Sequence, residues 1–169
     1  HQHTRRRRQR QMCIRDSYVI WQSDFCRKAS NEFLGNRSGE GEILYNAVDT
    51  EIFFPNNKNN GREFKLLITG NINKQNNYRI YCAFEALSLI LKIDKNVHLY
   101  IAGFIEDKNY FLSEINKLKI NDHVTFIGVY SQEKAAEIYQ MADAYISLTY
   151  QDNCPTAVLE AISCGLPII

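Results

Sequence analysis

The sequence predicts an α/β fold in which helices cover both faces of a parallel sheet. Two observations predict it. From residue 64 onward, apolar runs typical of buried strands alternate with segments of helical periodicity. The chain is also long enough for one domain with a hydrophobic core. Alternating strands and helices pack as parallel strands joined by right-handed crossovers, so the expected architecture is Rossmann-like.

Fewer helices and strands are predicted before residue 64 than after it. The run 18–20 indicates the end of a strand. Residues 23–35 have the pattern of a helix, with a serine at its start and a glycine at its end. Residues 41–55 indicate a short strand followed by an extended loop, and the polar, turn-rich stretch 56–63 indicates an exposed linker.

Four strands and the helices that connect them are expected after this linker. The strands are predicted at 64–70, 97–103, 123–128 and 144–149. The connecting helices are predicted at 77–92, 107–118 and 131–141. A last helix has Pro155 in its first turn and Gly165 just past its end, and residues 167–169 begin another strand.

Residues 7–17, RRQRQMCIRDS, resemble the in-frame translation of a common transposon sequencing adaptor. All of these residues agree with that translation. We therefore interpret residues 1–17 as non-native read-through. The alternative reading of the run Arg5 to Arg8, a basic arm for nucleic acid or a nuclear signal, is set aside for this reason.

Removing residues 1–17 changes the charge of the chain. Six of its 20 basic and one of its 19 acidic residues lie there, which leaves 14 basic and 18 acidic residues and a net charge of −4. A slightly acidic chain offers no electrostatic argument for a polyanion partner, so no nucleic acid is expected to bind.

Four cysteines remain after this removal, Cys26, Cys82, Cys154 and Cys164. Their spacing fits no zinc pattern, so no metal site is predicted. Cys82 and Cys164 fall in apolar helical patterns, and we expect small buried thiols in a reducing compartment. The sequence has no signal peptide and no apolar run near 20 residues, so no membrane-spanning segment is expected.

Two acidic residues flank the start of the last helix. Asp152 lies in the polar loop before it, and Glu160 lies on the helix, roughly 7–8 Å further along the axis. Helix N-termini attract phosphate, and ligands of parallel sheets bind outside the carboxyl ends of the strands. Gly70 and the loop 150–156 both fall at that edge. An elongated ligand with a central diphosphate would fit, although spacing alone leaves open a solvated loop acid and a surface glutamate.

Two stretches then resemble GT-B glycosyltransferases. ILYNAVDTEIFFP, residues 43–55, is similar to their linker signature: Asn46, Val48, Asp49, Phe53 and Pro55 match, and an alanine replaces the usual glycine. ADAYISLTYQDNCPTAVLEAISCGLPII, residues 142–169, resembles the donor-site block of glycosyltransferase family 4, in which seven residues separate two acids. Glu160 matches the second acid, and Asp152 stands where glutamate is more usual.

The resemblance implies a retaining transferase of the hexosyltransferase type. Such an enzyme moves a sugar from a nucleotide-diphosphate-sugar to a glycan or lipid-linked acceptor, without a cofactor or metal. Residues 18–63 would be the end of an N-terminal domain and the interdomain linker, and residues 64–169 a partial, truncated nucleotide-sugar-binding domain. The implied location is cytoplasmic, with peripheral association at the inner membrane face. The donor base, sugar and acceptor are not readable from the sequence.

The resemblance also assigns roles to residues of the donor site. Asp152 would bind hydroxyls of the donor sugar, and Glu160 would bind the ribose hydroxyls. The backbone N–H groups near Thr156 and Ala157 would meet the diphosphate, whose charge must be stabilised as it leaves. The acceptor-side catalytic residues are not identified.

The sequence departs from the family pattern after its first donor-domain strand. The family commonly has Gly-Arg there and a lysine a few residues on, and these cations neutralise the pyrophosphate. Here Gly70 is followed by Asn71, and Lys74 and Arg79 are the next cations, neither cleanly aligned. We include Gly70, Asn71 and Lys74 in the expected donor site. Whether Lys74 or Arg79 replaces the usual pair stays open, because each has the alternative of a solvated loop cation.

Two other functional classes are weighed against the transferase. A nucleotide-binding oxidoreductase would need Gly-x-Gly-x-x-Gly after the first strand, and TGNINKQ, residues 69–75, lacks it. A non-catalytic sugar- or nucleotide-binding module of the same fold is favoured by the missing arginine and by the aspartate at 152.

The resemblance implies that most of an acceptor domain and the last strands of the donor domain lie outside this sequence, which would leave a sheet edge unpaired. We therefore predict that the isolated 169-residue polypeptide has no transferase activity and limited solubility. A sugar-transfer assay and analytical ultracentrifugation would check this. An active, monodisperse preparation would contradict it.

Overall fold

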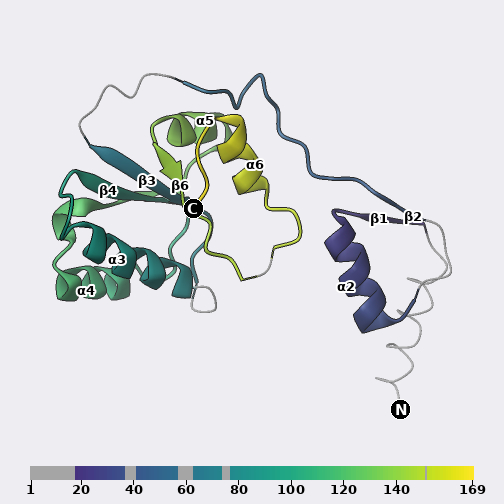
Figure 1. Cartoon of the computed structure of the whole chain (residues 1–169), viewed down its shortest axis with the longest axis horizontal. Coiled ribbons are helices and arrows are strands. Elements are labelled where there is room, and N and C mark those ends of the chain that lie inside the picture. The colour runs from purple at the N-terminus through teal and green to yellow at the C-terminus, as the bar shows by residue number, and fades with distance from the viewer. Residues whose placement is uncertain (1–17, 37–40, 57–62, 74–76, 151) are drawn as a thin grey trace, which may run out of the picture. The chain divides into compact units, whose positions relative to one another are not determined.

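The computed structural model describes residues 18–36, 41–56, 63–73, 77–150 and 152–169 (Figure 1). The chain divides into two compact units. The first contains the residues up to Ala47 together with Gln151–Pro155, and the second contains Val48–Tyr150 and Thr156–Ile169. Phe53, which falls in the predicted linker region, is buried in the second unit with its ring centroid 5.9 Å from that of Tyr139.

The first unit contains two short parallel strands, β1 (Val19–Trp21) and β2 (Gly41–Ile43), and the helix α2 (Asp24–Leu34). Ser23 caps the helix as predicted, because its Oγ accepts a hydrogen bond of 3.1 Å from the backbone N–H of Cys26. Gly35 follows the last helical turn with a φ of 84°, a value that favours glycine.

The second unit is built on a four-stranded parallel sheet, as the sequence predicts. Its strands are β3 (Phe64–Thr69), β4 (Val97–Ala102), β5 (Val124–Gly128) and β6 (Ala144–Tyr145), in the order β5-β4-β3-β6. Strand β6 is shorter than the predicted 144–149. The chain returns beside it after the last helix: the N–H of Tyr145 donates to the carbonyl of Pro167, and the N–H of Ile169 donates to the carbonyl of Tyr145, each at 2.9 Å.

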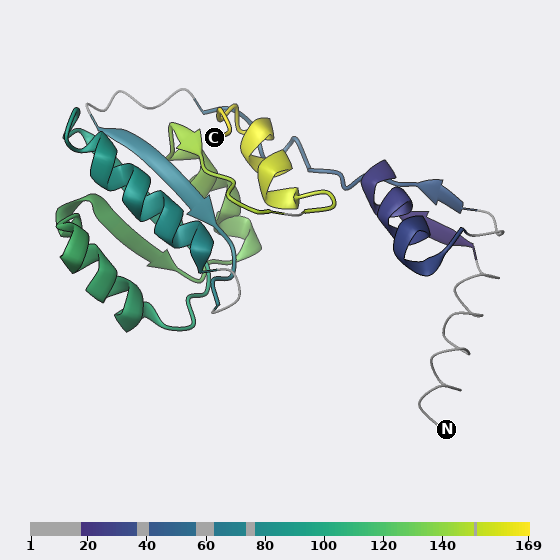
Figure 2. The ribbon, with the colours of Figure 1, turned by 60° about the horizontal axis from the view of Figure 1, so that its bottom comes forward.

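Helices cover both faces of this sheet. They are α3 (Tyr78–Ile90), α4 (Lys108–Leu118), α5 (Gln132–Gln140) and α6 (Thr156–Ser163), and a single 3-10 turn, η1 (Asn121–His123), precedes β5. Helices α3 and α4 lie on one face and α5 and α6 on the other (Figures 1 and 2). The predicted Rossmann-like architecture is therefore confirmed.

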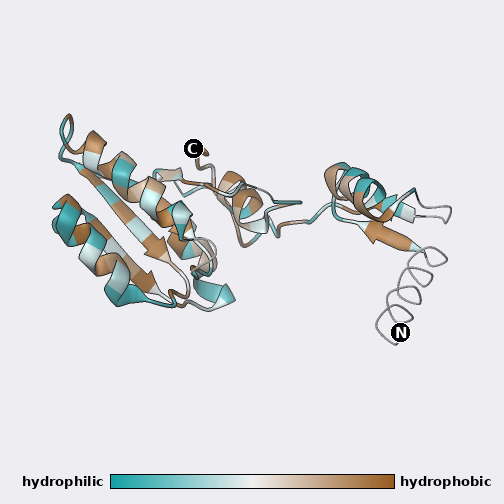
Figure 3. Ribbon diagram, turned by 90° about the horizontal axis from the view of Figure 1, so that it is seen from below, coloured by the Kyte–Doolittle hydropathy of each residue, from teal (hydrophilic) through white to brown (hydrophobic). Residues whose placement is uncertain are grey.

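The core has two layers because successive residues of a strand point to opposite faces. Leu66 and Ile68 of β3 belong to the layer under α3 and α4, whereas Leu67 belongs to the layer under α5 and α6. In Figure 3 the strands of this sheet carry mostly hydrophobic residues, and the helices alternate between hydrophobic and hydrophilic ones. This pattern is the one expected of a sheet buried on both faces.

One prediction about the cysteines is wrong. Cys164 is buried, as expected, but Cys82 is exposed on α3. The buried stripe of α3 includes Ile80 and Phe84. Cys82 lies two positions from each, about 200° around the helix, and therefore points away from the sheet.

Three glycines end three adjacent strands at the carboxyl edge of the sheet. Gly70, Gly103 and Gly128 have φ values of 121°, 125° and 86°. The N–H of Gly70 donates to the carbonyl of Ala102 at 3.0 Å, and the N–H of Gly103 donates to the carbonyl of Gly128 at 2.8 Å. A Cβ on Gly103 would lie 2.1 Å from the carbonyl oxygen of Gly70, so the backbones approach too closely for a side chain.

The close contact between Gly103 and Gly70 predicts that alanine at residue 103 lowers the free energy of unfolding more than alanine at residue 128. Gly128→Ala should destabilise the fold by about 1–2 kcal/mol, since only the left-handed backbone is strained and nothing lies within 4 Å of the new Cβ. Gly103→Ala should cost roughly 1–3 kcal/mol more, because the new Cβ meets backbone atoms that cannot move away cheaply. Chemical denaturation of both variants would check this, and equal midpoints would contradict it.

Candidate nucleotide-sugar site

The switch in strand order lies between β3 and β6. The chain runs from β3 to β4 to β5 on one side and places β6 on the other side of β3. Helix α3 leaves the carboxyl end of β3 and α6 leaves the carboxyl end of β6, on opposite faces of the sheet. Ligands of open α/β sheets bind in the crevice at such a point.

Five of the predicted site residues of the second unit lie at this carboxyl edge or on the helix that starts there, Glu160 among them. Gly70 and Asn71 directly follow β3, and Thr156 and Ala157 are the first two residues of α6. Asn71 and Thr156 are exposed, and Gly70 and Ala157 are half-buried. Lys74 lies outside the described residues.

Helix α6 is short and clearly terminated. The N–H of Gly165 donates to the carbonyl of Ile162 at 2.9 Å, and the N–H of Leu166 donates to the carbonyl of Ala161 at 3.0 Å. These two bonds form a Schellman motif, and the φ of 79° at Gly165 suits the glycine that the sequence places there. Ala161 is fully buried, which holds α6 against the sheet and sets the direction of Glu160.

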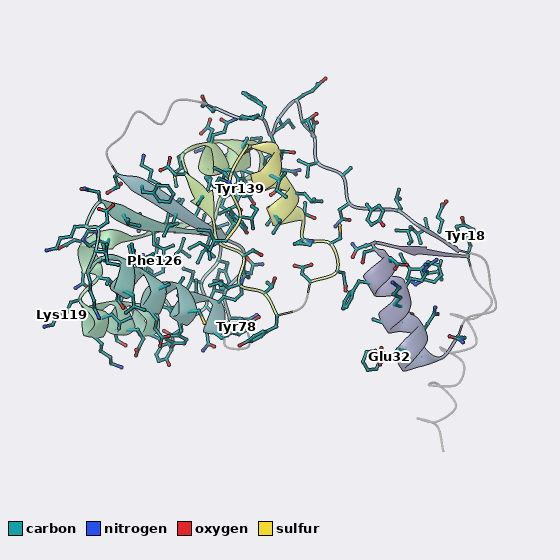
Figure 4. The ribbon with its side chains drawn as sticks, in the orientation of Figure 1. Tyr18, Glu32, Tyr78, Lys119, Phe126 and Tyr139 are labelled. Carbon is teal, nitrogen blue, oxygen red and sulfur yellow. The ribbon has the colours of Figure 1, made fainter. Side chains whose placement is uncertain are left out.

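Glu160 is held by a hydrogen bond from the neighbouring helix. The hydroxyl of Tyr139, in α5, donates to Oε2 of Glu160 at 2.8 Å. Tyr139 is completely buried, and its position is labelled in Figure 4. Glu160 itself is half-buried, and among the described residues its carboxylate accepts no second hydrogen bond. One carboxylate oxygen is therefore fixed by the protein.

A buried hydroxyl network supports Tyr139. Oγ1 of Thr69, the last residue of β3, lies 3.2 Å from the hydroxyl of Tyr139 and 3.0 Å from that of Tyr145. Burial raises the pKa of the phenols of Tyr139, Tyr145 and Tyr130 above their ordinary value. The tyrosines therefore remain protonated near neutral pH, and Tyr139 remains a donor to Glu160.

Tyr139 and Tyr145 are not among the residues predicted from the sequence to belong to the site, so the hydroxyl network was missed. Both are buried, and both carry polar atoms that need partners in the core. The signal in the sequence was that both positions hold tyrosine where phenylalanine would pack equally well.

Arg79 is the second residue of α3. From the sequence, it could be either a phosphate-binding residue or a solvated loop cation. Its Nη2 donates to the carbonyl oxygen of Thr69 at 3.4 Å, and the side chain is half-buried. Its Nη1 lies 3.8 Å from where a Cβ of Gly70 would be. Arg79 is therefore a helical residue whose guanidinium lies against the carboxyl end of β3, not a solvated loop cation.

Asp152 belongs to the first unit, and Glu160 to the second. Asp152 is exposed in the loop that precedes α6 in the sequence. The amide Nδ2 of Asn46, one of the residues of the linker signature, donates to the carbonyl of Cys154 in this loop at 2.7 Å. The linker residue thereby fixes the backbone two residues beyond Asp152.

A pocket of about 380 Å³ lies beside α4, and the described residues that line it include none of the predicted site residues. Its lining combines carboxylates, amides and aromatic rings: Ile72, Asn73, Asn77, Glu106, Asp107, Tyr110 and Phe111. Asp107 also caps α4, because its Oδ1 accepts from the N–H of Tyr110 at 3.1 Å. No pattern in the sequence predicts this pocket, since its described residues come from two separate segments, 72–77 and 106–111.

Within the described ranges, no three His, Cys, Asp or Glu side chains are grouped so as to hold a metal ion. His98 and His123 have structural partners, the hydroxyl of Thr125 at 2.8 Å and the carbonyl of Val97 at 3.0 Å. No helix in the same part of the chain has the length and apolarity that crossing a membrane requires.

Solved structures share this architecture. HepE from Anabaena, determined with UDP and glucose, superposes with a TM-score of 0.73 at 16% identity over 90% of this chain and 43% of its own. Sucrose-phosphate synthase from Thermosynechococcus elongatus superposes with a TM-score of 0.74 at 17% identity over 94% of this chain and 42% of its own. At these identities the likeness establishes the GT-B, Rossmann-like fold.

Two sequence comparisons complete the assignment. The alpha-monoglucosyldiacylglycerol synthase of Streptococcus pneumoniae is 29% identical over 90 residues, which cover 53% of this chain and 20% of that protein. The chain thus spans about a fifth of the curated relative and less than half of the two solved structures. The family model for glycosyl transferases group 1 matches residues 49–169, most of the chain. The chain belongs to the glycosyl transferases group 1 family.

Proposed function

We propose that the protein containing this chain is a retaining glycosyltransferase and that this chain supplies its donor site. The donor would be a nucleotide-diphosphate-sugar, and the acceptor a glycan or a lipid-linked sugar. Family membership supports the transfer of a sugar. The single observation that carries the assignment of the site is the half-buried carboxylate of Glu160, held by Tyr139 on the helix that starts at the strand switch point.

Glu160 would bind the ribose of the nucleotide. A carboxylate accepts hydrogen bonds only, so it suits a sugar edge that presents two hydroxyl donors. The hydroxyl of Tyr139 occupies one side of Oε2 and limits the rotation of the carboxylate. The other oxygen, Oε1, accepts no hydrogen bond from the described residues and could receive a ribose hydroxyl.

The start of α6 would bind the diphosphate. The N–H groups of its first turn, near Thr156 and Ala157, have no partner within the helix. They carry partial positive charge from the helix dipole, which favours a phosphate. Stabilising the charge that develops on the departing nucleoside diphosphate is the main electrostatic requirement of this chemistry.

Asp152 would bind hydroxyls of the donor sugar. It precedes the first residue of α6 by four positions, so its place in the chain is beyond the diphosphate, opposite to Glu160. The aspartate side chain is one methylene shorter than the usual glutamate. Either the loop therefore lies closer to the donor sugar, or Asp152 binds a different hydroxyl of that sugar. The hydrogen bond from Asn46 to the Cys154 carbonyl supports a fixed loop.

The named relatives support the donor and acceptor classes. HepE was solved with UDP and glucose, and the S. pneumoniae relative is named a synthase of a glucosyl lipid. We therefore propose a UDP-hexose as the first donor to test and a lipid-linked acceptor as the first acceptor. Such an acceptor would bring the protein, otherwise cytoplasmic, to the inner membrane surface. No metal is part of the proposed site.

Two charge substitutions test the donor site. Glu160→Gln and Asp152→Ala should each weaken binding by about 10- to 100-fold, since each removes hydrogen bonds to a charged group. Glu160→Gln should lose affinity for UDP or GDP. Asp152→Ala should lose affinity only for the sugar nucleotide. Titration calorimetry on the protein that contains this chain would measure both.

The matched control for these variants is Glu85→Gln, an exposed carboxylate on α3 that should change nothing. Binding of NAD in place of nucleoside diphosphates would indicate an oxidoreductase. Binding of no nucleotide by the unaltered protein would favour the non-catalytic module.

The hydrogen bond from Tyr139 predicts an effect on ribose recognition. Tyr139→Phe keeps the ring against Phe53 but removes the donor to Glu160, so affinity for UDP should fall about tenfold. The loss should be smaller for a 2′,3′-dideoxy nucleotide, because that ligand lacks the hydroxyls that Glu160 would bind. Calorimetry with both ligands would check this. Tyr145→Phe, which removes a hydroxyl bonded to Thr69 rather than to Glu160, is the control, and equal losses in both variants would contradict the prediction.

A further inference from the structure

We propose that Arg79 is the cation that binds the diphosphate of the nucleotide in this protein. The inference rests on the proposed function and adds the residue that holds the most charged part of the donor. It is carried by the position of the guanidinium at the strand switch point, by its neutral surroundings and by the open space that Gly70 leaves beside it.

The position follows from the topology. Strands β3 and β6 are neighbours on either side of the switch point. Arg79 lies in the first turn of α3, and its Nη2 reaches back to the carbonyl oxygen of Thr69 at the end of β3. The first turn of α6 approaches the same edge from the opposite face of the sheet. An anion at this edge would therefore meet a guanidinium from one helix and the positive end of the dipole of the other.

Gly70 leaves the guanidinium uncovered on one side. It has a φ of 121°. Among the described residues other than its two chain neighbours, the atom nearest to the position that its Cβ would occupy is Nη1 of Arg79, 3.8 Å away. A side chain at residue 70 would fill this space and adopt a backbone conformation that L residues rarely reach. The glycine thus gives a ligand access to Arg79.

The charge of Arg79 is not neutralised by the described residues. Its hydrogen-bond partner is a neutral carbonyl, and no carboxylate in the described part of the chain forms an ion pair with it. Its Nε is buried and has no hydrogen-bond partner. The positive charge reaches the Tyr145 hydroxyl, whose pKa it lowers against the larger effect of burial. A bound anion would stabilise a half-buried guanidinium that has an N–H without a hydrogen-bond partner. The planar guanidinium can also donate two parallel hydrogen bonds to phosphate oxygens.

Asn71, the described residue at the position of the usual arginine, does not offer the same charge. Asn71, directly after Gly70, is neutral and exposed, although it occupies the position of the arginine that is common in this family. Its amide could donate to a phosphate but would not neutralise one. The structure thus assigns to Arg79, in the first turn of α3, the charge that Asn71 lacks.

The test compares ligands that differ only in phosphate. Uridine, UMP and UDP, or the guanosine series if GDP binds better, would be titrated into the unaltered protein and into Arg79→Gln and Arg79→Lys. Arg79→Gln should weaken UDP binding about 10- to 100-fold and leave uridine binding unchanged, because only the charged contact is lost. Arg79→Lys should lose less affinity for UDP than Arg79→Gln, since lysine keeps the positive charge but cannot donate two parallel hydrogen bonds as arginine does.

The controls separate this inference from the proposed function. Lys92→Gln removes an exposed cation just past the far end of the same helix and should not change UDP affinity. If Arg79→Gln binds UDP as tightly as the unaltered protein while Glu160→Gln still loses affinity, Arg79 does not hold the diphosphate and the donor site stands. An equal loss for uridine and UDP would show a structural role for Arg79 and overturn the inference. If the unaltered protein binds no nucleotide, both proposals fail together.

Discussion

The hydrogen bond from Tyr139 to Glu160 is the interaction on which the proposed site depends. It joins α5 to α6 at a point where both helices pack on the sheet, and Thr69 ties the same hydroxyl to the end of β3. A phenol with a raised pKa stays a donor near neutral pH, so the carboxylate keeps its partner. The site residue is thus held by the core of the fold and not by a surface loop, which is the arrangement that precise ligand positioning requires.

The strand order explains why charge gathers at one place. Because β6 lies on the opposite side of β3 from β4 and β5, the helices that follow β3 and β6 lie on different faces, and both begin after the carboxyl ends of these neighbouring strands. Arg79 supplies a full charge from one helix, and α6 supplies the partial charge of its N-terminus from the other. Glycines that end β3, β4 and β5 keep side chains away from this edge. This distribution of charge is the basis on which we propose a diphosphate as the ligand of this edge.

The sequence predicted most elements because their signals are local. The apolar runs at β3, β4 and β5 and the terminating glycine after α6 depend on residues within each segment, and the structure confirms them. Cys82 was misplaced because a helical apolar pattern does not by itself say which side faces the sheet. Tyr139 was not predicted to belong to the site and the role of Arg79 stayed open, because their partners, Glu160 and Thr69, lie 21 and 10 residues away and reach them only through folding.

By itself the sequence determined the α/β class, the order of strands and helices and the two acids that flank the start of α6, since each follows from periodicity, turn residues and spacing along the chain. Only the tertiary structure decided that β6 lies beside β3, that Glu160 has a tyrosine partner and that Arg79 lies at the end of β3. The physical reason is that these features depend on packing between segments distant in sequence, where buried hydroxyls and a half-buried charge take the partners that the core brings to them.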